Sequence, residues 1–158
     1  MSRNIDKYKL NNVPQGLSCA GIVIFSNDTT QVLLVQTLVG HLGFPKGKPQ
    51  KLVATQKFET PQETAARELF EESGIQVSSL LFVPITETLK EYKSETKLSV
   101  QYYVATLKLD EQIKTLKLTF DQSELSFVRW YLIQEALQSA DLLPRRKQVL
   151  QSALKLAE

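Results

Sequence analysis

The sequence is poor in the residues that build sulfur-based or histidine-based sites. Of its 158 residues, one is cysteine (Cys19) and one is histidine (His41). A single cysteine excludes an intrachain disulfide and a zinc site built on cysteines, and a single histidine excludes a multi-histidine metal site. Cys19 lies in an apolar run, where a small buried side chain is its simplest role.

Long apolar runs and an excess of one charge are also missing. No segment approaches the roughly 20 apolar residues of a membrane span, and the polar N-terminus has no apolar signal region. We therefore expect a cytoplasmic protein with no membrane or disulfide partner. The net charge is +2, which indicates no large nucleic-acid surface. Oligomeric state stays undetermined at this level.

The length fits one domain over residues 1–158, with 1–14 as a loosely ordered lead-in. Apolar, β-branched runs predict strands at 17–25, 31–37, 80–85, 98–107 and 127–132, the first two joined as a hairpin. The charged stretch 87–97 and residues 50–60 are expected to be connections. Helices are expected at 61–73, near 134–139 and from Pro144 onwards. Without a regular βαβ alternation, this order favours an α+β fold with a mixed sheet.

The helix at 61–73 has clear start and stop signals. Thr60 is a plausible N-cap, Pro61 suits the first helical position, and Glu63 completes a capping-box pattern. Gly74 supplies a C-terminal stop.

Three glutamates share one side of this helix. With Arg67 set at 0°, Glu71 lies at about 40°, Glu68 at about 100° and Glu72 at about 140° on the helical wheel. Carboxylates crowded in this way repel one another, and Arg67 neutralises only part of their charge. A solvated acidic face is one interpretation. A site for Mg²⁺ or Mn²⁺, which prefer oxygen ligands, is the other.

The flanking residues favour the metal site. Gly47, Glu59 and the run Arg67-Glu68-Leu69-Phe70-Glu71-Glu72-Ser73-Gly74-Ile75 resemble the Nudix box, Gly-x5-Glu-x7-Arg-Glu-U-x-Glu-Glu-x-Gly-U, where U is bulky and aliphatic. Every fixed position from Glu59 to Ile75 matches. One feature departs from the pattern: eleven residues, 48–58, separate Gly47 from Glu59 where the family has five.

The resemblance implies an α/β/α sandwich with a loop-helix-loop metal site, and a hydrolase that cleaves phosphoanhydride bonds. It implies Glu68, Glu71 and Glu72 as metal ligands, with Gly47 allowing close approach of the backbone. Arg67 would orient a glutamate, and Glu59 would support the site. Glu71, Glu72 or Glu124, a loop residue outside the box, would act as base.

Substrate identity rests on weaker features. Lys46 and Lys48 flank Gly47 and could hold phosphate charge, or they are ordinary loop lysines. Tyr92 and the segment 130–136 resemble the diadenosine-polyphosphate hydrolases, which implies diadenosine tetraphosphate or a related dinucleoside polyphosphate as substrate. In that case Tyr92 and Tyr103 are candidate rings for stacking on a base. Alternatively, Tyr92 is an ordinary hairpin residue and Tyr103 is a packing residue.

Several alternatives stay open. They are capped mRNA, diphosphoinositol polyphosphate, a nucleoside triphosphate or ADP-ribose as substrate, or a nucleotide-binding module without catalysis. Capped RNA is the one nucleic acid expected as a ligand. A small-molecule nucleotide or polyphosphate is the partner that the resemblance implies.

Overall fold

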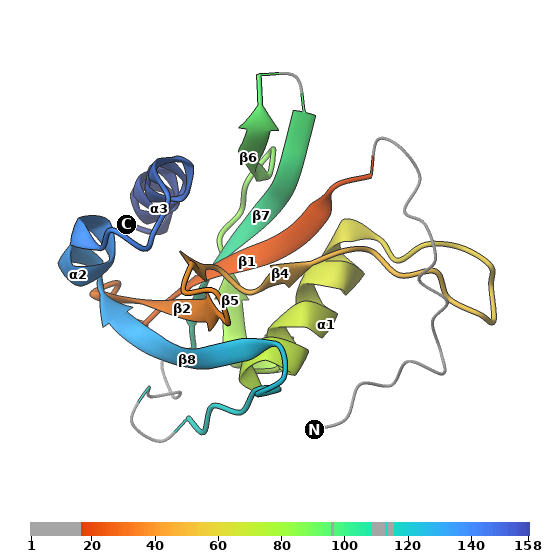
Figure 1. Cartoon of the computed structure of the whole chain (residues 1–158), viewed down its shortest axis with the longest axis horizontal. Helices are drawn as coiled ribbons and strands as arrows, with labels where there is room; N and C mark the ends of the chain where they lie inside the picture. Colours follow the sequence, from red (N-terminus) through yellow and green to blue (C-terminus); the bar gives the residue numbers. More distant parts are fainter. Residues whose placement is uncertain (1–16, 96, 109–112, 114–115) are drawn as a thin grey trace.

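The computed structural model describes residues 17–95, 97–108, 113 and 116–158 (Figure 1), and the expected lead-in at 1–14 lies outside them. In chain order the elements are β1 (Cys19–Phe25), β2 (Gln31–Thr37), β3 (Leu42–Gly43), β4 (Lys46–Gly47), α1 (Pro61–Ser73), the 3₁₀ turn η2 (Val77–Ser79), β5 (Leu80–Phe82), β6 (Leu89–Ser94), β7 (Lys97–Leu107), β8 (Leu125–Leu132), α2 (Ile133–Gln138) and α3 (Pro144–Ala157). Of the helices in the described ranges, none is long and apolar enough to cross a membrane.

The strands form one mixed sheet with β1 near its centre. Its main path runs β3-β2-β1-β7-β5, while β4 pairs with β1, β6 with β7 and β8 with β2. β1 runs parallel to β7, with Cys19 opposite Val100 and Phe25 opposite Thr106. The other strand pairs are antiparallel. The structure thus confirms the mixed sheet and the hairpin of the first two strands.

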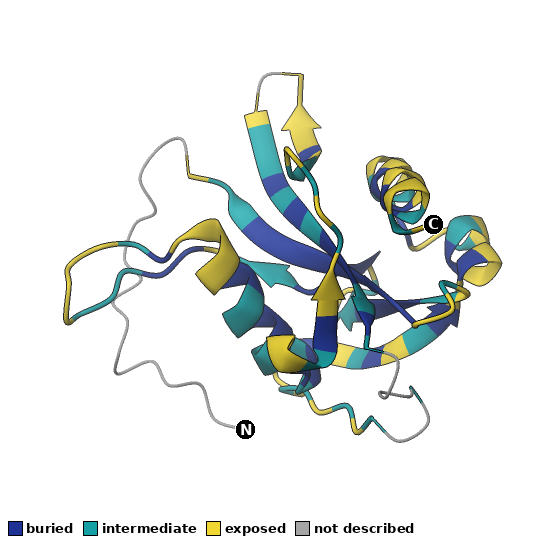
Figure 2. Ribbon diagram, turned by 180° about the vertical axis from the view of Figure 1, so that it is seen from behind, coloured by how far each residue is buried: buried dark blue, intermediate teal, exposed yellow. Residues whose placement is uncertain are grey.

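Helices cover both faces of the sheet, because the central strands bury apolar side chains on both sides. Val100, Tyr102 and Val104 of β7 join one core with residues of α2 and α3. Ala105 and Leu107 join the other core, which contains Ala65 and Leu69 of α1. Figures 1 and 2 show the resulting three layers, with α1 on one face and α2 and α3 on the other. This is the expected α/β/α sandwich.

Local signals set both ends of α1. The Thr60 hydroxyl accepts a hydrogen bond from the Glu63 N–H at 3.2 Å, and the Glu63 carboxylate accepts one from the Thr60 N–H at 2.9 Å. At the other end Gly74 is left-handed with φ 80°, and its N–H donates to the Phe70 carbonyl. The predicted capping box, helix bounds and glycine stop are therefore confirmed.

The charged stretch 87–97 differs from expectation, because it contains strand β6. Its outward residues are charged or polar, as is common on a sheet edge. The inward residue Glu91 is also charged, and it is buried because the structure pairs it with two arginines. This tertiary pairing offsets the penalty for a charge at an inward position, and sequence reasoning did not anticipate it.

Other element bounds shift slightly. The first strand begins at Cys19 rather than Leu17, and the strand expected to end at Ile85 ends at Phe82. The last strand begins two residues earlier, at Leu125, because it continues pairing with Thr37 across a register shift. The short helix after it begins at Ile133, one residue earlier than expected.

The long connection before α1 is a narrow hairpin rather than irregular chain. Lys51 pairs with Phe58, and the Leu52 N–H donates to the Lys57 carbonyl at 2.8 Å. At its tip Gln56 has a left-handed backbone with φ 58°. The hairpin reaches past the N-terminal end of α1 in Figure 1. The residues in excess of the box spacing thus form an appendage whose base lies beside Glu59.

Candidate active site

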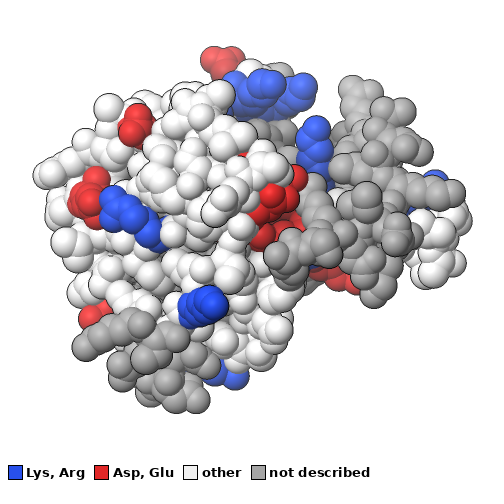
Figure 3. Space-filling model, turned by 60° about the horizontal axis from the view of Figure 1, so that its bottom comes forward, with Lys and Arg blue, Asp and Glu red and all other residues white. Residues whose placement is uncertain are grey.

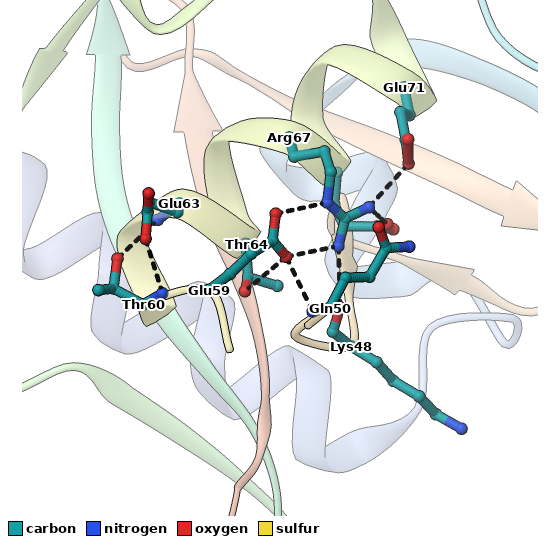
Figure 4. Close-up of polar contacts among 9 residues, drawn as sticks. Lys48, Gln50, Glu59, Thr60, Glu63, Thr64, Arg67 and Glu71 are labelled. Carbon is teal, nitrogen blue, oxygen red and sulfur yellow. Dashed lines mark hydrogen bonds and ion pairs between the residues drawn. The ribbon is translucent and has the colours of Figure 1, made fainter. Parts of the chain in front are cut away.

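Arg67 is the centre of the polar cluster on α1 (Figure 4). Its guanidinium contacts Glu59 at 2.8 and 3.0 Å, Glu71 at 2.9 Å and Glu68 at short range. It also donates to the Lys48 carbonyl at 2.9 Å. Although burial alone would lower it, the hydrogen bond with Glu59 and the charges of Glu68 and Glu59 raise the pKa of Arg67. The contact with Glu71 is the one that the four-residue spacing predicts.

Glu59 connects α1 to the loop in front of it. Its carboxylate is buried and accepts hydrogen bonds from the Gln50 N–H at 3.0 Å and the Thr64 hydroxyl at 3.2 Å, besides its contacts with Arg67. Because one carboxylate bonds to the loop backbone, to a hydroxyl of the helix and to Arg67, it holds these parts in a fixed relation. This geometry agrees with the supporting role that the resemblance implies.

Gly47 lies directly against the carboxylate of Glu68. A Cβ atom on Gly47 would stand 2.1 Å from both the carboxyl carbon and Oε2 of Glu68. Backbone and carboxylate can approach this closely only because the residue has no side chain. The structure therefore brings together two candidate metal ligands that are 21 positions apart in sequence.

Glu72 is held in place by the same loop. Its Oε1 accepts a hydrogen bond from the Lys46 N–H at 3.0 Å. Burial raises the pKa of Glu72 to about 8, and the negative charges of Glu68 and Glu124 add to this effect, while the Lys46 contact opposes it. Glu124 precedes β8 on a different part of the chain, so the fold places this exposed loop carboxylate within electrostatic reach of the helix.

The charge and donor type of the cluster fit a hard divalent cation. Glu72, whose pKa is raised by burial and by neighbouring carboxylates, would gain from a cation, and hard cations prefer carboxylate and carbonyl oxygens. Within the described residues no three His, Cys, Asp or Glu side chains already converge as ligands, since Glu68 and Glu71 turn towards Arg67. Acidic side chains gather near the middle of the face in Figure 3.

The candidate substrate residues separate in space. Lys46 and Lys48 lie on either side of Gly47, and the Lys48 side chain extends away from the polar cluster in Figure 4. Tyr92, which is 47% exposed, lines a groove between β6 and α3. Tyr103 instead packs against the core on the α1 face. The structure does not bring the two tyrosines together.

Sequence reasoning missed the polar residues that surround this cluster. Gln50 and Thr64 are buried and bind Glu59, while Glu91 is buried and binds Arg145 and Arg146. Only one signal pointed to Glu91, namely its period-two spacing from Leu89, which is typical of an inward strand position. The arginine doublet in the first turn of the last helix gave no indication of its partner.

The NUDIX domain family model matches residues 17–153. Among solved structures, the Ap4A hydrolase of C. elegans in a binary complex superposes with a TM-score of 0.64 at 22% identity, covering 85% of this chain and 94% of that one. A NUDIX family hydrolase from Clostridium perfringens also gives 0.64, at 17% identity over 92% of this chain and 100% of that one.

A third similar structure is the NUDIX domain of Shewanella oneidensis NrtR complexed with ADP ribose. Its TM-score is 0.62 at 20% identity, over 96% of this chain and 94% of that one. No curated protein sequence matches the chain significantly. These structural likenesses show the fold, and the domain match over most of the chain shows the family. The chain belongs to the Nudix family and carries the glutamates and arginine of a Nudix hydrolase.

Proposed function

We propose that this protein hydrolyses a phosphoanhydride bond in a nucleoside polyphosphate, with diadenosine tetraphosphate or a related dinucleoside polyphosphate as preferred substrate, and that the reaction depends on Mg²⁺ or Mn²⁺. The observation that carries the proposal is the crowding of Glu68 and Glu72 against the backbone of residues 46–47, with Glu124 nearby.

In this proposal Glu68, Glu71, Glu72 and the backbone of Gly47 would hold the cation. When bound, a divalent cation neutralises phosphate oxygens, lowers the pKa of a water molecule and stabilises the leaving phosphate. The oxygen of water forms a bond to phosphorus as the anhydride P–O bond breaks, and the leaving phosphate takes the electron pair.

The chain's own groups complete the reaction. Glu124 would accept the proton of the attacking water, because it is exposed in a loop facing the carboxylates of α1. Arg67 would hold Glu71 in position through their 2.9 Å contact. The Lys46 ammonium would bind phosphate charge while its backbone N–H holds Glu72.

Two features support a dinucleoside polyphosphate over a shorter substrate. Tyr92 lines a groove of about 330 Å³ between β6 and α3, apart from the carboxylate cluster. Its exposed ring offers a stacking surface for a base. Two of the similar structures, at 22% and 24% identity, are C. elegans Ap4A hydrolases.

A metal-dependent screen with products identified by mass would test the proposal. The substrates are diadenosine tetraphosphate, nucleoside di- and triphosphates, ADP-ribose, capped RNA and diphosphoinositol phosphates. We expect turnover of diadenosine tetraphosphate with Mg²⁺, and a loss of several orders of magnitude in Glu72→Gln.

The matched control is Glu63→Gln, because Glu63 is an exposed acid of the same helix and glutamine can also complete a capping box. It should keep full turnover. Turnover of another substrate in preference would correct the substrate assignment. Tight nucleotide binding without turnover in the wild type would favour a non-catalytic binding module.

A further inference from the structure

A second polar cluster lies on the opposite face of the sheet from α1. Glu91 of β6 is 1% exposed, and its carboxylate accepts hydrogen bonds from the Tyr102 hydroxyl at 2.8 Å and from Arg145 Nε at 2.7 Å. Arg146 Nε lies 3.3 and 3.4 Å from its two oxygens. Burial alone would raise the pKa of Glu91, but the bonds from Arg145 and Tyr102 and the charge of Arg146 lower it. One buried negative charge thus binds two adjacent arginines.

The two arginines differ in what else they contact. The side chain of Arg146 is 12% exposed, and its Nη1 donates to the Leu42 carbonyl at 2.7 Å. It packs so tightly that a Cβ on Gly43 would stand 3.0 Å from Nη1. The side chain of Arg145 is 41% exposed and is held by Glu91 through Nε. Arg146 therefore connects α3 to the sheet. In Arg145, by contrast, Nε is held by Glu91 while the side chain stays partly accessible to solvent.

Arg145 faces the groove between β6 and α3. This groove of about 330 Å³ is lined among others by Lys90, Tyr92, Arg145, Gln148, Val149 and Ser152. Lys90, Arg145 and Arg146 outnumber the two nearby carboxylates, which are Glu91 and Glu87, the latter 3.8 Å from Lys90, so the groove has a net positive charge. A groove that combines cationic groups, an exposed aromatic ring and an apolar floor suits an anionic ligand with a planar ring.

The groove lies at a defined distance from the carboxylate cluster. Lys46 pairs with Gly21, Gly21 with Tyr102, and Tyr102 with Leu89. Three spacings between neighbouring strands, each about 4.8 Å, place the groove strand roughly 14 Å from Lys46. A single phosphate cannot span this separation, so a ligand that occupied both sites would have to be an extended molecule.

We propose that Arg145, held in place by the buried Glu91, binds phosphate oxygens of the substrate remote from the bond that is cleaved, and so selects polyphosphates long enough to span both sites. This inference rests on the proposed function, because it assigns the far end of the same substrate. A guanidinium fixed in advance loses less entropy on binding than a mobile lysine, and its planar fork matches phosphate.

The main test is Arg145→Gln, with KM and kcat measured separately. Because hydrogen bonds to charged groups contribute roughly 1.5–3 kcal/mol, we expect KM for diadenosine tetraphosphate to rise about 10- to 100-fold with kcat nearly unchanged. Arg145→Lys should restore part of the affinity. Arg129→Gln is the matched control, since Arg129 is also an exposed arginine paired with one carboxylate, Glu135, and its KM should stay at the wild-type value.

Two results would overturn the proposal. One is an unchanged KM in Arg145→Gln. The other is a loss of both kcat and thermal stability in Arg145→Gln, which would mean that Arg145 has a structural role. Arg146→Gln provides the comparison, because we expect it to lower Tm.

A binding assay separates this inference from the proposed function. If the wild type cleaves no dinucleoside polyphosphate, the proposed substrate is wrong, and calorimetry with inorganic tripolyphosphate then decides the role of Arg145. We expect the wild type to bind this probe and Arg145→Gln to bind it at least tenfold more weakly. Equal affinity, or no binding to the wild type, would refute the anion site.

Discussion

Because carboxylates crowd together at α1, we can predict how the stability of Glu72→Gln in the absence of metal differs from that of the wild type as pH changes. In the folded protein the pKa of Glu72 is about 8, against an ordinary value of 4.5. Between these values the folded state holds a proton that the unfolded chain has released. The free energy of unfolding therefore falls as pH rises from about 4.5 to about 8, and levels off above that. Glutamine keeps the acceptor for the Lys46 N–H but cannot ionise.

The size of the effect follows from the pKa difference. One pKa unit corresponds to about 1.4 kcal/mol, so the wild type should lose on the order of 4 kcal/mol relative to Glu72→Gln between pH 5 and 9. Groups that do not interact with Glu72 contribute equally to both proteins, so the difference between the two curves reports Glu72 together with its coupling to Glu68 and Glu124. Mg²⁺ at a hundred times its Kd should return about 2.7 kcal/mol to the wild type and much less to the variant.

The assay is urea unfolding with EDTA or Mg²⁺, monitored by the fluorescence of Trp130, the single tryptophan. Glu63→Gln serves as the control and should follow the wild-type curve. If the free energy of unfolding depended on pH in the same way in the wild type and in Glu72→Gln, burial and like charge would not raise the pKa of Glu72. Equal stabilisation of both by Mg²⁺ would remove Glu72 from the metal site.

Three further predictions concern the loop and the start of α1. Gly47→Ala places a Cβ 2.1 Å from Glu68, so we expect about a 100-fold loss in kcat, as for a 1 Å displacement of a reacting group, with an unchanged circular dichroism spectrum. Glu59→Gln removes the negative charge that pairs with the buried Arg67, and it should lower the free energy of unfolding in urea by roughly 3 kcal/mol. An unchanged free energy of unfolding would mean that the pair is solvated. Thr60→Ala removes the N-cap and should cost about 1 kcal/mol while turnover stays at the wild-type rate.

Features that depend on neighbouring residues in sequence were predictable from the sequence. The bounds of α1, its capping box and its glycine stop follow from short-range hydrogen bonds and backbone preferences at Thr60, Glu63 and Gly74. The contact between Arg67 and Glu71 follows from helix geometry in the same way. The resemblance in the box residues then identified the family, and with it the sandwich fold.

Only the tertiary structure determined the properties that depend on burial and on long-range pairing. The pKa of Glu72 rises because distant segments exclude water from it and bring Glu124 close to Glu72 and its helix neighbour Glu68. β6 forms in a charged stretch because Glu91 meets arginines more than fifty positions away. A charge in an isolated sequence indicates a solvated surface, and only the assembled fold supplies the partners that allow it to be buried.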